Sequence, residues 1–411
     1  MKILLISYYY LFKDNTGSLR AQAMAKYLPQ NGIEVAVLTY CAQSNPVSYC
    51  DGVVGVRDIT RETVSLPVFY ALRILQRGMR WLGVYRGLCE NWRDTVLSNA
   101  DEIIASIRPD VILASYPSVE ALEIGVALAE KYSLPLITDF RDGLLFEPLD
   151  TNAQRHRSVR EHHQKLEARL VAVSKLILTV SEPISAYFRS HYLHTNVVTL
   201  HNGFDTDDIV PDLTWALPAE VINIVHTGRL GISRAATAGK GRGVDALVSA
   251  LNMLQARTPE LAKHLQVHFV GHLSSQEKKS LELLFDKNTV KLWGHQPRAR
   301  ALGFQRLADV LLLITAPDQA SIATGKLFEY LATDKPILAL TRGTEAERII
   351  RDTGTGLVAP PDKPEEIFTA LKLLVRQRGI LMPSRNEGSI ADFSRSRQLS
   401  KLAHHIRTMH M

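Results

Sequence analysis

The chain has 411 residues, of which 46% are hydrophobic and 22% are charged. This composition is that of a folded globular protein and excludes a disordered or collagen-like chain. The length exceeds the size at which one hydrophobic core keeps growing, so we expect two domains. The formal net charge is +6 and the pI is about 9.1, which favours anionic partners. No RNA- or DNA-binding motif accompanies this charge, and we expect no nucleic-acid partner.

Cysteines and long apolar stretches are both scarce. Cys41, Cys50 and Cys89 are odd in number and lack metal-ligand spacing, so neither a disulfide framework nor a zinc site is predicted. No apolar run approaches the roughly 20 residues that span a bilayer. The apolar run over residues 1–12 has one early lysine and no small-residue cleavage site after it, which favours a buried first strand over a signal peptide. We therefore expect a cytoplasmic protein that meets a membrane only at its surface.

Short β-branched runs alternate with amphipathic helical stretches along the whole chain. This alternation is typical of βαβ units, in which helices cover a parallel sheet. A stretch rich in Pro, Asp and Thr over Asp205–Glu220 interrupts the pattern and marks a domain boundary. We predict strands at Lys2–Ser7, Glu34–Thr39, Val111–Ser115, Leu134–Phe140, Leu176–Ser181 and Val197–Leu200, then at Ile222–His226, Val267–Val270, Val290–Trp293, Val310–Ile314 and Pro336–Leu340.

The predicted fold is therefore α/β, with two Rossmann-like domains whose parallel sheets face an interdomain cleft. Residues 1–205 form the first domain and residues 206–388 the second. The basic, helical residues 389–411 are expected to cross back to the first domain. Ligands of open α/β sheets bind outside the carboxyl ends of the strands, so we expect the functional residues there.

Two segments of the first domain follow strands at such positions. Gly17 and Ser18 open a helix, and free amides at a helix N-terminus favour an anion or a sugar hydroxyl. Asp139, Arg141 and Asp142 emerge from an apolar run, where three charges cannot be buried unpaired. Either Arg141 bridges a neighbouring acid, or this group faces the cleft and orients a substrate.

The second domain carries two glycine-containing segments after its first strand. Gly228 and Arg229 follow the strand directly, and the stretch Ala238–Gly243 adds Lys240 and Arg242 before the next helix. Cationic side chains beside exposed amides suit a diphosphate, whose charge they neutralise as it departs. The alternative is a solvated surface loop.

The most informative segment is Ala320–Ala332. Thr324 and Gly325 form a turn at a predicted helix N-terminus, where their amides and that of Lys326 can hold a phosphate. Glu329 lies one turn further on, in a helix otherwise lined by apolar residues. A carboxylate at this place can accept both hydroxyls of a ribose, and we expect Glu329 not to be an ion-pair partner in the core.

With these residues in place, the chain resembles glycosyltransferase family four, a group of retaining enzymes with the GT-B fold. The resemblance covers nearly the full length. Each motif is loose, but their order and spacing are specific. The motifs are Thr16-Gly17-Ser18 with Arg20, Val180–Ser181, His201–Asp205, Gly228–Arg229, Val270–Gly271, Trp293–Gly294, Ala308–Val310 and Gly325–Pro336.

The resemblance implies an N-terminal acceptor-binding domain and a C-terminal domain for a nucleoside-diphosphate sugar, with no cofactor and no divalent metal. It implies that Arg229 and a second cation, Arg242 with Lys240 as its rival, hold the diphosphate. Glu329 is then the ribose ligand, and Gly294–His295 lies where backbone groups meet the base.

Two positions depart from the family pattern. The family often carries two glutamates separated by seven residues, and Ser321 stands where the first is expected. The acceptor-side strand end is often a histidine, and here Asp139, Arg141 and Asp142 compete for its role. The segment Asp205–Asp207 matches a metal-binding pattern of a different glycosyltransferase fold, but it falls in the predicted linker, so we predict no metal site.

The expected activity is transfer of a sugar, with retention, from a nucleotide sugar to a glycan or lipid-linked acceptor in cell-surface polysaccharide biosynthesis. Three alternatives remain. They are a GT-B nucleotide-sugar epimerase, a soluble glycosyltransferase of small molecules, and a non-enzymatic nucleotide or partner binder, the last suggested by Ser321.

Residues 66–88 carry four arginines and no acid. Arg73, Arg77 and Arg80 recur at helical spacing among apolar and aromatic residues, so one face of a helix can enter lipid while the arginines meet anionic headgroups. We predict peripheral binding at the inner face of the plasma membrane. The alternative is a helix packed on its own domain with its arginines, including Arg86, in water.

Overall fold

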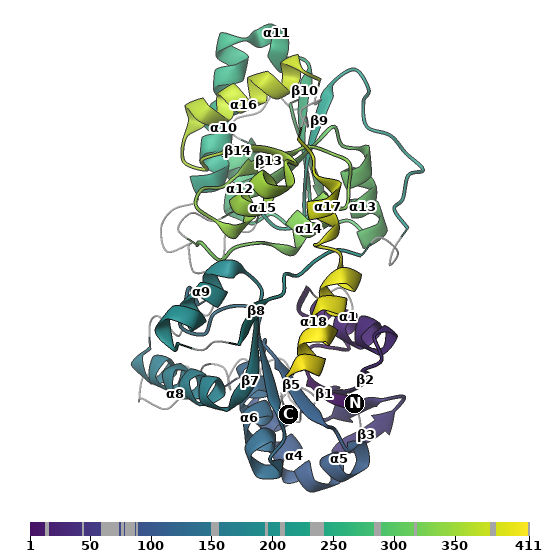
Figure 1. Cartoon of the computed structure of the whole chain (residues 1–411). Coiled ribbons are helices and arrows are strands. Elements are labelled where there is room, and N and C mark those ends of the chain that lie inside the picture. The colour runs from purple at the N-terminus through teal and green to yellow at the C-terminus, as the bar shows by residue number, and fades with distance from the viewer. Residues whose placement is uncertain are drawn as a thin grey trace. The chain divides into compact units, whose positions relative to one another are not determined.

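The computed structural model describes residues 1–12, 16–42, 45–58, 74, 78, 87, 89–148, 156–193, 196–205, 210–230, 242–282, 289–315, 319–378 and 384–409. These residues form two compact units (Figure 1). The first comprises Met1–His201 with Arg395–Met411, and the second comprises Asn202–Ser394. The change of unit thus falls after His201, four residues before the predicted boundary at 205.

The first unit contains an eight-stranded sheet with the order β3-β4-β2-β1-β5-β6-β7-β8. Its described strand pairs are parallel except for the antiparallel β3–β4 hairpin at one edge. The strands are β1 (Lys2–Ile6), β2 (Glu34–Tyr40), β3 (Val47–Cys50), β4 (Val53–Val56), β5 (Val111–Ser115), β6 (Leu136–Phe140), β7 (Ser174–Thr179) and β8 (Val197–Thr199).

Helices cover both faces of this sheet, which explains its nearly continuous apolar strands. In β1, Ile3 and Leu5 join the core on one face, whereas Leu4 and Ile6 join the core on the other. The helices are α1 (Thr16–Gln30), α4 (Glu90–Ser98), α5 (Ala100–Ile107), α6 (Val119–Tyr132), α8 (Arg157–Val173), α9 (Glu182–His191) and α18 (Arg395–Thr408).

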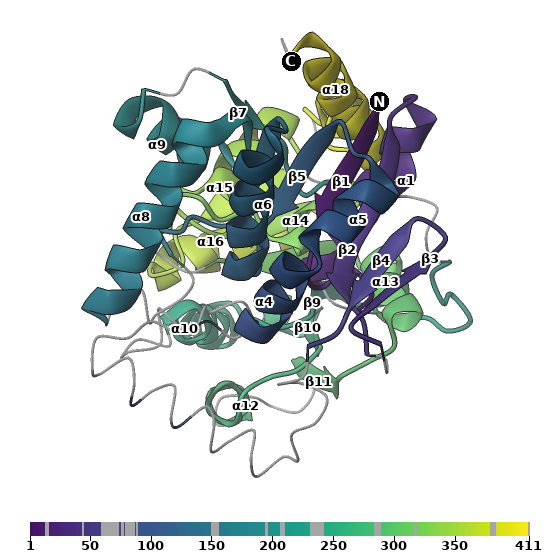
Figure 2. The same cartoon turned by 90° about the horizontal axis from the view of Figure 1, so that it is seen from below.

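The C-terminal helix α18 belongs to the first unit although it follows the whole second unit in sequence. Leu402 and Ile406 are fully buried in the same core as Met24 of α1. At the end of α18, the Arg407 guanidinium donates a hydrogen bond to the carbonyl of Asn31. Figures 1 and 2 both show α18 beside α1. The last helix therefore completes the core formed by the first.

The second unit contains a six-stranded parallel sheet with the order β11-β10-β9-β12-β13-β14. Its strands are β9 (Ile222–Thr227), β10 (Leu265–Val270), β11 (Val290–Gly294), β12 (Val310–Ile314), β13 (Ile337–Leu340) and β14 (Gly356–Ala359).

Helices again cover both faces, and each face has its own apolar core. The strand β12 is fully buried, as expected for a central strand of a doubly covered sheet. The helices are α10 (Arg242–Arg257), α11 (Pro259–Ala262), α12 (Ser275–Glu282), α13 (Arg298–Leu307), α14 (Gly325–Leu331), α15 (Glu345–Thr353), α16 (Pro364–Arg376) and α17 (Glu387–Ala391).

All eleven predicted strands are present, with ends that differ by at most two residues, and the α/β architecture is confirmed. Three short strands were not predicted: β3, β4 and β14. The β3–β4 hairpin turns at Asp51 and Gly52, both with positive φ, and Asp-Gly is a strong signal for such a turn. Four-residue strands at sheet edges carry too little periodicity to be read without that signal.

The predicted membrane-binding helix over residues 66–88 lies outside the described residues, apart from isolated positions. Among the helices of the described chain, none is both long enough and apolar enough to span a bilayer.

Candidate functional site

The carboxyl ends of the neighbouring strands β9 and β10 meet at two glycines. Gly228 follows β9 with φ +81°, and Gly271 follows β10 with φ +149°. The N–H of Gly228 donates to the carbonyl of Val270 at 2.6 Å, and a Cβ at Gly271 would lie 2.3 Å from the Gly228 oxygen. Position 271 therefore accepts only glycine. Beyond this contact Gly228 and Arg229 are exposed, as a ligand-binding turn requires.

Lys326, at the start of α14, reaches back to this turn. Its Nζ donates to the carbonyl of Arg229 and lies 3.4 Å from Nε2 of His226. A Cβ at Gly228 would lie 3.6 to 3.8 Å from the end of the lysine chain. Burial lowers the pKa of Lys326 to about 8, although Glu329 and Glu277 act in the opposite direction. The sequence predicts a role for the Lys326 amide, and the structure places its side chain against the turn at Gly228–Arg229.

His226, the fifth residue of β9, supports the turn from beneath. Its ring is fully buried, with Nδ1 2.9 Å from the Leu312 carbonyl and Nε2 3.2 Å from the Arg229 carbonyl. Burial and the nearby Lys326 ammonium lower the pKa of His226 to about 3. The ring is therefore neutral at physiological pH, and it contacts the carbonyl of Arg229.

Glu329 lies one turn into α14, and both of its carboxylate oxygens have partners. Oε1 lies 2.9 Å from the Arg298 guanidinium, and Oε2 accepts a hydrogen bond from Gln305 at 3.0 Å. Gln305 also donates to the Thr227 hydroxyl, which ties the carboxylate to the end of β9. Glu329 thus has an ion-pair partner, but the pair is not in the core. The pair is half-exposed, because the Glu329 side chain is 25% and that of Arg298 is 35% exposed.

The loop before α14 is held by the first turn of α15. Glu345 donates its N–H to the Ala320 carbonyl at 2.8 Å, and Ala346 donates to Ile322 at 2.9 Å. Thr324 is the extended N-cap residue of α14, and its carbonyl accepts from the N–H of Leu327. Three of the predicted residues, Thr324, Gly325 and Lys326, therefore lie together at the start of α14. The fourth, Ser321, lies half-buried in the preceding turn.

The remaining residues predicted for donor binding and catalysis in the second unit are His295, Lys240 and Arg242. His295 is exposed directly after Gly294, which has φ +64° at the end of β11. The parallel strands β11, β10 and β9 end at the same edge of the sheet, so His295 lies on the edge that carries Gly228. Lys240 lies outside the described residues, as does the side chain of Arg242.

In the first unit, Asp139 at the end of β6 is fully buried in an ion pair with Arg20 of α1. Nε and Nη2 of Arg20 contact both carboxylate oxygens, and the Ser115 hydroxyl donates to Oδ2 at 2.8 Å. Nη1 of Arg20 donates to the carbonyls of Leu200 and His201. The prediction that Asp139 orients an acceptor is wrong, because a carboxylate with no exposure and four hydrogen bonds cannot reach a ligand.

Arg141 and Asp142 remain half-exposed beyond the end of β6. Nη1 of Arg141 donates to the Gly17 carbonyl at 2.5 Å. Burial raises the pKa of Asp142 to about 6, and Asp139 adds to this rise whereas Arg141 opposes it. Burial lowers the pKa of Arg141. Of the three predicted residues, these two are partly exposed, and their role in orienting the acceptor stays a prediction.

The Ser18 hydroxyl is not available to a ligand, whereas the role of the amides at Gly17 and Ser18 stays a prediction. The Ser18 side chain is buried, and its hydroxyl donates to the carbonyl of Phe12 at 2.9 Å. Ser18 therefore fixes the segment before α1, and the neighbouring Gly17 is partly exposed.

A buried acidic cluster at the ends of β1, β4 and β5 was not predicted. The Tyr8 hydroxyl donates to Asp58 at 2.9 Å, and the N–H of Cys89 donates to Glu120 at 2.8 Å. Burial raises the pKa of Glu120, and burial together with Glu120 raises that of the Cys89 thiol. The available signal was the position of Asp58, two residues after β4, but that strand was itself missed.

Two family models match the chain. A glycosyl transferase 4-like domain matches residues 16–203, and a glycosyl transferases group 1 domain matches residues 224–377. The chain belongs to the GT-B glycosyltransferases. The two matched segments lie in the first and second structural units, respectively, apart from the last two residues of the first match.

The fold of this glycosyltransferase is shared with many solved structures. The Anabaena HepE protein in complex with UDP-glucose has a TM-score of 0.60 at 15% identity, over 99% of this chain and 100% of that one. The N-terminal domain of Candida albicans trehalose-6-phosphate phosphatase has a TM-score of 0.65 at 12% identity, over 100% and 97%. A UDP-GlcNAc 2-epimerase from Neisseria meningitidis bound to UDP-GlcNAc has a TM-score of 0.53 at 12% identity, over 99% and 100%. No curated protein matches the sequence.

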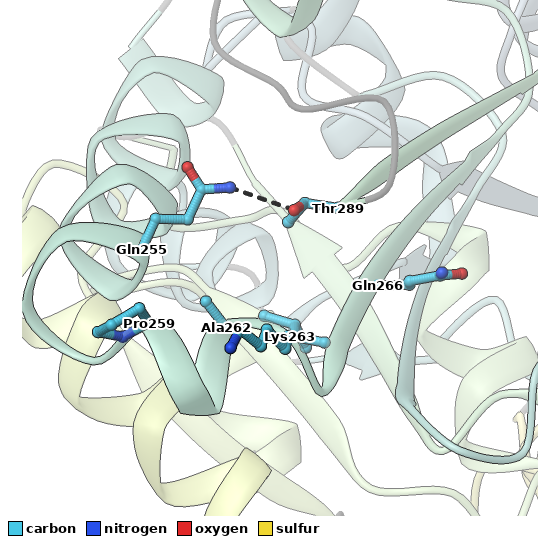
Figure 3. A pocket seen from close by; sticks show the side chains of 7 residues that line it. Gln255, Pro259, Ala262, Lys263, Gln266 and Thr289 are labelled. Atoms are coloured by element: carbon cyan, nitrogen blue, oxygen red, sulfur yellow. Dashed lines mark hydrogen bonds between the residues drawn. The ribbon is translucent and has the colours of Figure 1, made fainter.

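One pocket of this glycosyltransferase lies away from the candidate donor residues (Figure 3). It has a volume of about 360 Å³ and lies at the amino ends of β10 and β11, the opposite edge of the sheet from Gly228. In it, Gln255 donates a hydrogen bond to the Thr289 hydroxyl at 3.2 Å. The pocket is lined by Gln255, Pro259, Ala262, Lys263, Leu265, Gln266 and Thr289.

Proposed function

We propose that this glycosyltransferase moves a sugar from a nucleoside-diphosphate sugar to a glycan or lipid-linked acceptor, with retention of the anomeric configuration and without a divalent metal. The observation that carries the donor half is the arrangement at the end of β9. There the exposed Arg229 directly follows Gly228, and the partly exposed Glu329 lies one helical turn beyond Lys326. Similar structures contain UDP-glucose and UDP-GlcNAc, which supports UDP as the nucleotide.

The leaving group determines what the site must do. The bond between the anomeric carbon and the phosphate oxygen breaks, and its electron pair stays on the phosphate. Arg229, with Arg242 or Lys240 as the predicted second cation, stabilises this developing charge. The acceptor oxygen forms its bond to the anomeric carbon from the same face, and its proton passes to the departing phosphate.

Asp142 is the residue that we propose for orienting the acceptor. Its carboxylate, at the end of β6, is ionised at neutral pH because its pKa is about 6. An ionised carboxylate accepts a hydrogen bond from a sugar hydroxyl, and Arg141 beside it is held by the Gly17 carbonyl. The first unit is therefore the acceptor-binding unit in this proposal.

We further propose that the acceptor is part of cell-surface polysaccharide synthesis and that residues 66–88 hold the enzyme at the inner face of the plasma membrane. Each arginine near an anionic surface contributes roughly 1 kcal/mol. Co-sedimentation with vesicles tests this, with wild type compared with the Arg73/Arg77/Arg80→Glu variant. We expect anionic vesicles to retain only the wild type. Equal recovery in the supernatant would favour a soluble small-molecule acceptor.

A panel of nucleotide sugars tests the donor half by thermal stabilisation. A ligand at 100 times its dissociation constant contributes about 2.7 kcal/mol, which is visible as a shift in Tm. We expect UDP-sugars to stabilise the protein in the presence of EDTA. If no nucleotide sugar stabilises it, the donor assignment is wrong.

The runner-up is a nucleotide-sugar epimerase of the same fold, since two solved UDP-GlcNAc 2-epimerases have similar structures. An epimerase would produce a new nucleotide sugar without any acceptor. Product analysis in the absence of acceptor therefore separates the two functions.

A further inference from the structure

Lys326 carries a positive charge that meets only neutral groups in the described part of the chain. Its Nζ donates to the Arg229 carbonyl and faces Nε2 of His226, whose ring is neutral. The carboxylates that influence it, Glu329 and Glu277, do so without forming an ion pair with it among the described residues. Glu329 is instead held by Arg298.

This arrangement costs free energy in the absence of an anion. An ammonium taken out of water is stabilised only if an opposite charge or several hydrogen bonds replace the lost hydration. The lowered pKa of Lys326 has burial as its largest cause, in agreement with this cost. Such uncompensated charges are frequent at ligand sites, where the ligand completes the balance.

The surroundings of the ammonium suit a phosphate group. Gly228 presents an exposed turn with no side chain, and the end of the Lys326 chain lies 3.6 to 3.8 Å from the place where a Cβ would stand. Arg229, the next residue, is exposed. A second cation therefore stands beside a turn that a ligand can approach closely. An ammonium and a guanidinium at one turn can neutralise a diphosphate.

We propose that the side chain of Lys326 is a diphosphate ligand, which exchanges the Arg229 carbonyl for a phosphate oxygen when the donor binds. The inference rests on the proposed function and deepens it. It gives a side chain at the start of α14 a role that the family resemblance assigns to Arg242 or Lys240. Glycine at 228 suits this arrangement, because its φ of +81° is one that residues with a side chain rarely adopt.

The proposal predicts that donor binding takes up a proton above pH 8. A phosphate raises the pKa of Lys326, so a lysine that is partly deprotonated in the free enzyme becomes protonated in the complex. The charged groups that face it are Arg229 beyond β9, Glu329 on α14 and Glu277 on α12, with the neutral His226 on β9. His226 does not change its protonation near pH 8, because its pKa is about 3.

Calorimetric titration with UDP at pH 8.5, in two buffers of different ionisation enthalpy, measures this uptake. We expect wild type to take up a measurable fraction of a proton per UDP. Lys326→Met should bind UDP roughly tenfold to hundredfold more weakly and without uptake. Lys326→Arg should bind without uptake, because a guanidinium stays protonated. Lys363→Met removes an exposed lysine of the same unit and should behave like wild type.

Three results would overturn the proposal. Lys326→Met could bind UDP with the affinity and proton uptake of wild type, which would leave the proposed function standing. If that variant does not fold, persistent uptake in Lys326→Arg would have the same meaning. If folded wild type binds none of UDP, GDP and ADP, the donor-binding function itself fails and the inference fails with it.

Discussion

Arg20 and Asp139 are 119 residues apart in sequence and form a buried, bidentate ion pair with N–O distances of 2.7 to 3.1 Å. Their side chains are 4% and 0% exposed. The pair joins α1 to the end of β6, and the remaining Arg20 nitrogen, Nη1, donates to the carbonyls that follow β8. Three elements of the first unit are therefore fixed around one guanidinium.

Removing either partner should destabilise the protein strongly. Asp139→Asn or Arg20→Met leaves a buried charge uncompensated, and we expect the free energy of unfolding to fall by about 3 to 5 kcal/mol. Urea unfolding measures this. Glu161→Gln, which breaks the exposed pair of Glu161 with Arg157, is the control and should cost less than about 1 kcal/mol. Similar losses for the two pairs would contradict the structural role of Asp139.

Glu329→Ala should weaken donor binding while leaving the fold intact. The half-exposed pair with Arg298 contributes little to stability, whereas loss of the carboxylate removes the proposed acceptor for two ribose hydroxyls. We expect the Kd for UDP to rise roughly tenfold or more. Glu347→Ala, which breaks a surface pair with Arg351, is the matched control. Unchanged UDP affinity with a large loss of stability would show that Glu329 is structural.

The pH profile of transfer should reflect Asp142. Burial raises the pKa of Asp142 to about 6, and the ionised carboxylate is a stronger acceptor for the acceptor's hydroxyl than the protonated acid. Transfer should therefore rise as pH increases through about 6. Steady-state rates from pH 5 to 8 measure this. The Asp142→Asn variant should have low activity and should not show the rise in rate near pH 6. If the variant shows the same rise in rate with pH as wild type, the rise belongs to another group.

Two buried histidines should make the second unit sensitive to acid. Burial lowers the pKa of His226 to about 3 and that of His268 to about 4. The unfolded state binds protons below about pH 6.5 and the folded state does not, so stability is lost as pH falls through this window. Each histidine contributes a slope of about 1.4 kcal/mol per pH unit.

Urea unfolding at pH 7, 6 and 5 tests this slope. His226→Gln should flatten the dependence, and His264→Gln, at an exposed position, should leave it as in wild type. Equal slopes in all three proteins would exclude His226 as a source of the acid sensitivity.

The sequence predicts the strands well because most of them are apolar runs bounded by polar or glycine residues, as in β5 and β12. The predicted site residues Gly228, Arg229 and Glu329 keep accessible positions at one sheet edge or on a helix near it, and their role in donor binding stays a prediction. The sequence does not predict which side chains these charged residues contact. Asp139 bonds Arg20 because β6 lies beside β5 in the sheet and α1 covers it, an arrangement that local spacing does not contain.

The same limit applies to the second unit. Arg298 reaches Glu329 from a different helix, and the Lys326 side chain folds back onto a turn 97 residues earlier in the chain. The sequence predicts a role for the Lys326 amide only, since nothing near Lys326 in sequence indicates that its side chain lies against the buried His226. Long-range placement therefore decides which charged residues are structural and which face a ligand.

The most direct test of glycosyl transfer is to follow a UDP-sugar by ¹H NMR with the purified protein in EDTA and no acceptor. Glycosyltransferases release sugar slowly to water, so we expect UDP and free sugar to accumulate, with the sugar first appearing as the anomer that the donor carried. Removal of divalent ions should not abolish this. Accumulation of a different UDP-sugar without free UDP, or turnover only after Mg²⁺ or Mn²⁺ is added, would contradict a metal-independent, retaining transferase.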